Sequence, residues 1–448
     1  MDIETAPGLP ARSRTLDNWL PPPQRSLQMG QWVKLICGAS YQDMPTVRRL
    51  VMIYALAGVD CIDVAADGAV VTAARRGLED AARLAGYLGD RNHLIPGLPW
   101  LMVSLNDSED PHFRKAHFDA AHCPPDCDRP CEPICPTAAI QFQAPNQGSV
   151  ATDLCYGCGR CIAVCPIANI EAQPYLASPE AFPVEQLAQI DAVEIHTQTG
   201  HQTQFAQLWQ RLVPWRSHLK LISISCPDHD QVVPYLWDLY RLMAPLDIPL
   251  IWQTDGRPMS GDLGKGTTHA TIRLAQKILD AGPPGYVQPA GGTNGYTVRK
   301  LLDLALINQV PSAALLDDSQ PHGLLSSQSF GQAAGVNRHD LGLTYPSICN
   351  SNMGRTIAGI AYGSYGRSQL LPLLDAIDQD LQPWLGHASP GQSSSGQWTQ
   401  NSSNGVPPDP AAPWQLLDDT TLGQALTLAR DLVGQIKVDR HFLPTRYG

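Results

Sequence analysis

Eight of the twelve cysteines in this 448-residue chain fall into two runs of four, and each run ends in Cys-Pro. In the second run the gaps hold two, two and three residues, the spacing with which bacterial iron-sulfur proteins wrap a chain around a cluster. In the first run all three gaps hold three residues. In two-cluster proteins the fourth cysteine of each run ligates the cluster of the other run. We therefore predict one [4Fe-4S] cluster on Cys155, Cys158, Cys161 and Cys135, and a second on Cys123, Cys127, Cys131 and Cys165.

The wider gaps of the first run require its loop to bulge by one residue at each of the first two gaps. This leaves open a more labile cluster, or a three-iron form, on that run. Structural zinc is an alternative, but zinc favours paired cysteines at a tetrahedral site. Disulfides are another, but they need an oxidising compartment. Neither explains two Cys-Pro endings, so iron-sulfur ligation is the interpretation we adopt.

Charged residues near the two runs differ in sign. Asp126, Asp128 and Glu132 accompany the first run, whereas Arg160 lies within the second. Negative neighbours disfavour the addition of an electron and positive neighbours favour it. The cluster on Cys123, Cys127, Cys131 and Cys165 is therefore predicted to have the lower reduction potential.

The whole chain is acidic, with a formal net charge of -11 and a pI of about 5.6. This charge repels nucleic acid and anionic membrane surfaces. No apolar run approaches the roughly 18 residues that a transmembrane helix needs, and the first residues lack the pattern of a signal peptide. We expect a cytoplasmic protein without a transmembrane segment and without nucleic-acid partners.

The segments before and after the two cysteine runs alternate between predicted strands and helices. Buried strands and amphipathic helices alternate from residue 31 to 110 and again from 176 to 385, and they provide eight strands in all. Eight such units close a TIM-barrel-like (β/α)8 domain. An open doubly wound α/β sheet is the alternative. In the predicted organisation, residues 1–30 are a disordered arm, 111–175 an inserted ferredoxin-like module, 386–413 a flexible linker and 414–448 a docking helix. Residues 309–356 are irregular and are expected to form a lid or an extra subdomain.

Side chains at the carboxyl ends of barrel strands share one mouth, where barrel enzymes place their chemistry. Nine residues are candidates there by position: Cys37, Asp67, Asn106, His196, Cys226, Asp228, Asp255, Arg257 and Lys265. For each alone, a structural role as helix cap or core residue is more common than catalysis. Two glycine-rich loops after the last strands are predicted to bind a phosphate-bearing ligand, FMN being one such group. Their residues are Gly291, Gly292, Thr293, Asn294, Gly363, Ser364, Gly366 and Arg367.

The two cysteine runs, the strand WVKLICGAS and the segments CIDVAADGAVVTAARRGL and GIAYGSYGRSQLL together resemble the cyanobacterial light-dependent-period family. The resemblance covers residues 30–385 and the final helix. It implies a two-cluster iron-sulfur protein that conveys light-dependent cellular redox state to the circadian clock and modulates its period. It also implies partners among clock-input proteins, a histidine kinase and KaiA. Only the eight cysteines carry over residue by residue, and no catalytic residue is implied.

Two other functions remain open at this point. A flavin-dependent barrel oxidoreductase would use the two clusters to feed electrons to a bound FMN. A binding scaffold would use them only to hold the inserted module together. Redox carriers such as ferredoxin or quinone are further candidate partners. The candidate locations are the cytoplasm and, by peripheral attachment, the thylakoid membrane.

Overall fold

The computed structural model describes residues 22–37, 43–88, 97–109, 114–144, 147–152, 154–176, 179, 188–256, 267–307, 356–377 and 420–437. Several predicted features lie outside these residues: most of the amino-terminal arm, the linker at 386–413, the irregular segment at 309–355, and the candidates Arg257 and Lys265.

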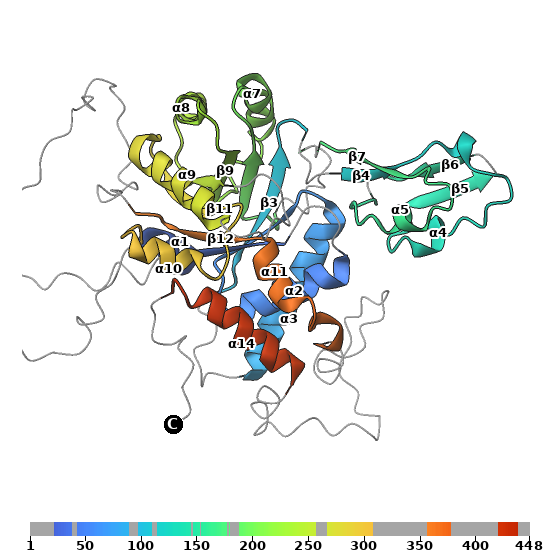
Figure 1. Ribbon diagram of the computed structural model, residues 1–448, viewed down its shortest axis with the longest axis horizontal. Coiled ribbons are helices and arrows are strands. Elements are labelled where there is room, and N and C mark those ends of the chain that lie inside the picture. The colour runs from blue at the N-terminus through green and yellow to red at the C-terminus, as the bar shows by residue number, and fades with distance from the viewer. Residues whose placement is uncertain are drawn as a thin grey trace, which may run out of the picture.

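Eight strands form one parallel sheet that curves into a nearly closed barrel (Figure 1). The end strands meet where the N–H of Ala358 donates to the carbonyl of Val287, at 2.9 Å. The predicted α/β barrel is thereby confirmed. In sheet order the strands are β11 (Tyr286–Ala290), β10 (Leu250–Asp255), β9 (Leu221–Pro227), β8 (Ala192–His196), β3 (Trp100–Asn106), β2 (Cys61–Ala65), β1 (Trp32–Ile36) and β12 (Gly359–Tyr362).

Helices follow the strands and cover the outside of the barrel. Strands β2 and β3 are buried at every position, because the helices cover one face and the barrel interior covers the other. A final helix, α14 (Thr421–Val433), packs its apolar face against helices α2 and α11. The helices that follow strands are α2 (Met44–Leu56), α3 (Gly68–Leu88), α7 (Gln202–Arg211), α8 (Val232–Met243), α9 (Thr267–Ala281), α10 (Thr297–Asp303) and α11 (Ser364–Leu370).

An apolar layer closes the amino-terminal end of the barrel. Trp32 and Trp100 meet there edge to face, with ring centroids 5.9 Å apart, and Leu27 packs among them. Leu27 belongs to helix α1 (Pro22–Met29), which lies within the range expected to be a disordered arm. The arm prediction is therefore corrected for residues 22–29, which are helical because Leu27 buries its side chain in this layer.

Gly359 allows strand β12 to lie close against β1. A Cβ atom at this position would lie 2.0 Å from the carbonyl oxygen of Trp32. We expect Gly359→Ala to lower the free energy of unfolding by about 2–3 kcal/mol, because the clash is with backbone that cannot move aside. Gly363→Ala is the control, since its new methyl group would meet only Arg367 Nη1, at 3.9 Å. Urea unfolding of both variants tests this, and equal stabilities would contradict it.

The eight cysteines of the two runs lie in a small module, residues 114–176, which is inserted between β3 and β8 and projects from the barrel (Figure 1). Two antiparallel pairs frame it: β4 (Arg114–His117) with β7 (Glu171–Pro174), and β5 (Ile140–Ala144) with β6 (Gln147–Val150). Two short helices, α4 (Cys131–Ile134) and α5 (Arg160–Val164), lie between the strands. Phe118, Ile140 and Ile170 form a small core together with several of the cysteines.

Candidate metal centre

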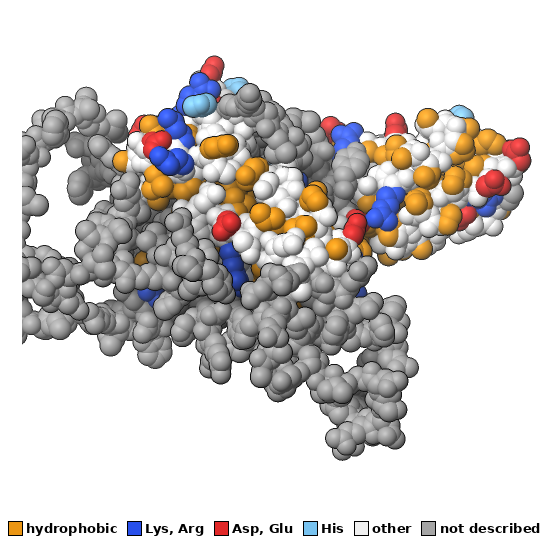
Figure 2. All heavy atoms as spheres, turned by 60° about the horizontal axis from the view of Figure 1, so that its bottom comes forward, with side chains coloured by type: hydrophobic (Ala, Val, Ile, Leu, Met, Phe, Trp, Pro, Cys, Tyr) orange, Lys and Arg blue, Asp and Glu red, His pale blue; other side chains and the backbone are white. Residues whose placement is uncertain are grey.

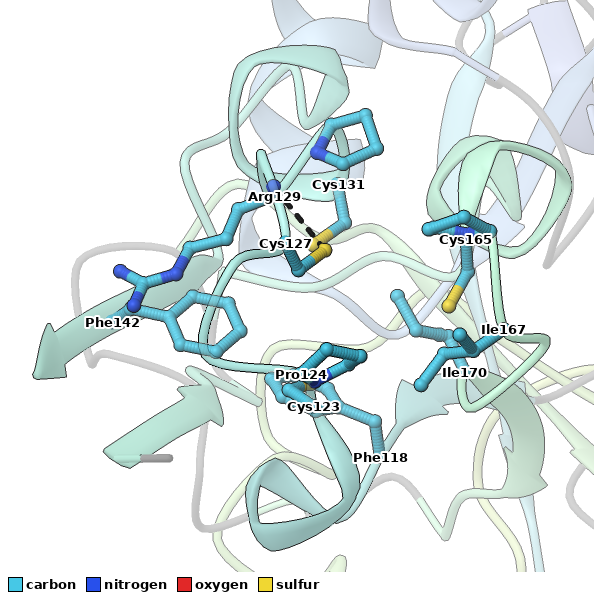
Figure 3. A pocket seen from close by; sticks show the side chains of 12 residues that line it. Phe118, Cys123, Pro124, Cys127, Arg129, Cys131, Phe142, Cys165, Ile167 and Ile170 are labelled. Atoms are coloured by element: carbon cyan, nitrogen blue, oxygen red, sulfur yellow. Dashed lines mark hydrogen bonds between the residues drawn. The ribbon is translucent and has the colours of Figure 1, made fainter. Parts of the chain in front are cut away.

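The module places its eight cysteines around two cavities, four to each. The empty volume of each cavity, including the space open to solvent, is about 330 Å³. Figure 3 shows the first cavity. We call its cysteines the outer set: Cys123, Cys127, Cys131 and Cys165. The cysteines of the other cavity are the inner set: Cys135, Cys155, Cys158 and Cys161.

This division crosses the two runs, because each run sends its last cysteine to the other cavity. After each of these last cysteines the chain makes a turn of the same shape. After Cys135-Pro136, Ala138 adopts a φ of 51°, and the N–H of Ala139 donates to the Cys135 sulfur at 3.2 Å. After Cys165-Pro166, Ala168 adopts a φ of 52°, and Asn169 donates to the Cys165 sulfur at 3.3 Å. Each Cys-Pro ending is therefore followed by the same turn, which returns an N–H group to the cysteine sulfur.

The irregular first run reaches the outer cavity through local turns. The N–H of Cys127 donates to the Pro124 carbonyl at 3.1 Å, which closes one turn. Arg129 takes a left-handed φ of 51° and donates its N–H to the Cys127 sulfur at 3.4 Å, the dashed line of Figure 3. These turns take up the extra residues, so wide spacing does not keep the outer set apart.

Further N–H groups point at the sulfur atoms. The N–H of Ala116 donates to Cys155 at 3.4 Å, and the side-chain amide of Asn169 donates to Cys123 at 3.5 Å. Burial works against ionisation of Cys135, but the N–H groups of Thr137 and Ala139 outweigh it and lower the pKa of this thiol. Burial and the neighbouring sulfurs raise the pKa of Cys161 to about 11. N–H donors of this kind suit the thiolate ligands of an iron-sulfur cluster.

A single metal ion, such as zinc, is the alternative occupant of a cysteine site. Among the residues that the structure describes, no three His, Cys, Asp or Glu side chains are grouped closely enough to hold one. A zinc ion needs its thiolates at about 2.3 Å. Four cysteines line each cavity, which is the number of ligands that a [4Fe-4S] cluster takes.

The inner set borders the barrel. Tyr156, beside Cys155, is part of the barrel's hydrophobic core, and Cys158 packs against that core. On strand β4, Lys115 lies 3.2 Å from the Asp67 carboxylate of the barrel and also donates to the Thr152 carbonyl. The inner set therefore lies next to the end of the barrel where strands finish.

The outer set lies farther out on the module. Figure 2 shows apolar side chains spread over the module and acidic ones at its far end. Ile167, which is 44% exposed, lines the outer cavity, whereas the exposed Ile134 and Leu154 directly precede the inner-set cysteines Cys135 and Cys155.

A buried polar network fills the middle of the barrel, and it was missed from the sequence. Lys34 on β1 pairs with Glu194 on β8 and lies 3.3 Å from Asp63 on β2, and all three side chains are at most 1% exposed. Ser223 and Gln253 donate to the two Glu194 oxygens at 2.7 and 2.8 Å. Burial disfavours the charged amine, but the two carboxylates more than compensate and raise the pKa of Lys34. One charged residue within each of three apolar strands was the available signal.

The predicted mouth residues serve varied roles. Asp67 accepts the N–H of Ala69 at 3.0 Å and so caps helix α3. His196 lies 3.3 Å from Glu194, and Asp255 accepts a hydrogen bond from Ser225. Asp228 pairs with Lys277 on the surface, at 3.0 Å. Asn106 donates to two carbonyl groups, while Cys37 and Cys226 are buried thiols whose pKa burial raises to about 12. His196 and Asp255 thus lie above the buried network, whereas Asp67 and Asp228 serve structure.

The two glycine-rich loops lie side by side, as expected from neighbouring strands. Thr293 donates its hydroxyl to the Ala361 carbonyl at 2.6 Å. Gly291 and Gly292 have φ values of 55° and 111°. Arg367 donates to the Ile36 carbonyl at 2.6 Å and to Ser364 at 3.2 Å. These contacts use many of the hydrogen-bonding groups of the two loops. Binding of a phosphate-bearing ligand there stays a prediction.

No helix within the described ranges has the length and apolar character needed to cross a bilayer.

Two family models match the chain. One, described as "LdpA Fe-S cluster-binding domain", matches residues 123–176. The other, "Light dependent period A C-terminal domain", matches residues 185–435. The first match contains all eight cysteines of the two cavities, and the second covers more than half of the chain.

A curated relative agrees with these models. The chain is 55% identical to "Light dependent period A" of Synechococcus elongatus over 286 residues, which is 64% of this chain and 77% of that protein. Among solved structures, an aldo/keto reductase from Brucella melitensis aligns with 61% of this chain and 74% of its own, at 11% identity and a TM-score of 0.26. A score this low supports no conclusion about fold or activity.

Proposed function

Because this chain belongs to the light dependent period A family, we propose that it senses cellular redox state through two iron-sulfur clusters and adjusts the period of the circadian clock. The observation that carries the proposal is the crossed division of eight cysteines around two cavities. The matches to an iron-sulfur domain model and to a light dependent period A protein support it independently of the structure.

The residues of the chain fit this role. A [4Fe-4S] cluster on each set would supply one-electron chemistry. The thiolates would hold it, and the N–H donors of Ala116, Ala139 and Asn169 would stabilise its negative charge. Phe118, Phe142 and Ile170 line the outer cavity and limit access of water. The chain thus has the means to bind a redox centre and to set its potential.

The first experiment is anaerobic purification followed by quantitation of iron, sulfide and flavin. We expect ~8 irons per chain and the EPR spectrum of two interacting cubane clusters after reduction. About four irons per chain would contradict the two-cluster proposal. Stoichiometric FMN would instead favour the flavin-dependent oxidoreductase, whose ligand would sit at the glycine-rich loops.

The proposed partners are clock-input proteins, a histidine kinase and KaiA, in the cytoplasm. Purified KaiA can be titrated against the oxidised and the reduced protein at equal concentration. The sensor proposal expects a different affinity for the two states, because only a differential interaction can carry a redox signal. Equal affinity of KaiA for the oxidised and the reduced protein would favour the scaffold.

A further inference from the structure

We propose that Asp43 and Arg160 couple the inner set to helix α2, so that the charge held by the inner set acts on the amino terminus of that helix. This inference rests on the proposed function, because it requires a cluster on the inner set. It concerns residues of the barrel and module that lie outside the eight cysteines.

The coupling runs through one carboxylate. Arg160 lies between Cys158 and Cys161 and lines the inner cavity. Its Nη2 atom is 3.3 Å from Asp43 Oδ2. The other oxygen, Oδ1, accepts the N–H of Thr46 at 2.9 Å and so caps helix α2. The same side chain therefore contacts both a cation beside the cysteines and the first turn of a barrel helix.

A second aspartate, Asp67, also caps a barrel helix and pairs with a cation of the module. That cation, Lys115, is not among the residues that line the inner cavity. Asp67 Oδ1 accepts the N–H of Ala69, and Oδ2 pairs with Lys115 at 3.2 Å. Helices α2 and α3 pack against each other, so the module meets the barrel at the amino ends of two neighbouring helices. Of these two aspartates, Asp43 is the one paired with a residue that lines the inner cavity, so we expect the effect of redox charge there.

Charge decides the direction of the effect. An electron supplied by a chemical reductant makes the inner set one unit more negative, which repels Asp43 and draws Arg160 toward the cysteines. The pair is partly screened, since its side chains are 46% and 28% exposed. The cap on α2 should therefore loosen on reduction. By linkage, Asp43 must lower the tendency of the inner set to accept the electron.

The test is Asp43→Asn in the full-length protein, because asparagine is an equally good helix cap but carries no charge. An EPR-monitored redox titration should show about a threefold higher ratio of reduced to oxidised inner cluster at a fixed potential, ~28 mV for a one-electron couple. The inner cluster is identified by the signal that is lost in Cys155→Ser. Hydrogen exchange near Thr46 should rise on reduction in the unmodified protein and become independent of redox state in the variant.

Two further variants keep the test decisive. Arg160→Gln should lower the reduction potential of the inner cluster, the opposite of the effect of Asp43→Asn. It takes the place of Asp43→Asn in the test if that variant fails to fold. Arg129→Gln is the matched control: Arg129 lines the outer cavity and lies over the Phe142 ring, at 4.4 Å, so it should shift only the other cluster. Inner-set iron with unchanged potentials and redox-independent exchange would overturn the coupling alone. Absence of inner-set iron from the unmodified protein would overturn both the coupling and the proposed function.

Discussion

Cys135→Ser is expected to remove the cluster bound by the inner set and to leave the outer one, so that iron falls from ~8 to ~4 per chain. The reason is geometric, since Cys135 lines the inner cavity although it ends the first run. Serine is a far weaker ligand for iron than a thiolate. Iron quantitation and EPR of the reduced variant provide the measurement.

The pattern among variants tests the crossing itself. Cys135→Ser and Cys155→Ser should leave the same residual EPR signal, and Cys165→Ser and Cys123→Ser should leave the other. Cys37→Ala is the control, because this buried thiol lies outside both cavities and its loss should leave the iron content unchanged. If Cys135→Ser instead matched Cys123→Ser, each run would bind its own cluster, and the assignment would be wrong.

Lys34→Met is expected to destabilise the barrel by about 3–5 kcal/mol, because it leaves buried carboxylates without their cation. Glu194 is paired directly with Lys34, and Asp63 lies 3.3 Å from it. Methionine has a similar length, so the loss comes mainly from charge rather than from a cavity. Urea unfolding of both proteins, followed by circular dichroism, gives the difference.

The pH dependence of this loss identifies its cause. Burial favours the protonated acid, but Lys34 holds the pKa of Glu194 down to about 2. This depressed pKa contributes stability above the ordinary value of 4.5, and the contribution is lost as the pH falls toward 2. In Lys34→Met the carboxylates can take up protons at higher pH, so the stability difference should shrink as the pH is lowered. A loss that is constant between pH 7 and about 4.5 would indicate packing instead.

A paired substitution separates charge from packing further. Lys34→Met combined with Glu194→Met removes both members of the pair, and apolar replacement of a buried ion pair is often neutral. The double variant should therefore be more stable than Lys34→Met alone. A double variant that is less stable than the single one would contradict the electrostatic account.

The barrel could be predicted because its strands are buried on both faces and appear as short apolar runs between amphipathic helices. The polar network could not. Lys34 and Glu194 are 160 positions apart, and their pairing depends on the register of the strands between them. A charged residue inside an apolar strand indicates that a partner exists, but only the closed sheet shows which one.

The cysteine sets were predictable for a different reason. Ligand spacing is local, so the second run could be recognised without knowledge of the fold, and the crossing was predicted from the usual arrangement of two-cluster proteins. The turns of the first run depend on Arg129, whose left-handed φ is uncommon for a residue other than glycine and is not indicated by its type. Likewise, the partners of Arg367 and Thr293 lie on strands distant in the sequence, so the loops could be located but not their hydrogen bonds.

The position of β12 sets an order of events during synthesis. This strand completes the ring between β1 and β11, yet it begins at Gly359, more than 320 residues after β1 ends. Until the ribosome has released it, β1 and β11 both present unpaired backbone edges of the kind that promote association between chains. The cysteine module, complete by residue 176, emerges much earlier. Cofactor insertion into the module can therefore precede closure of the barrel.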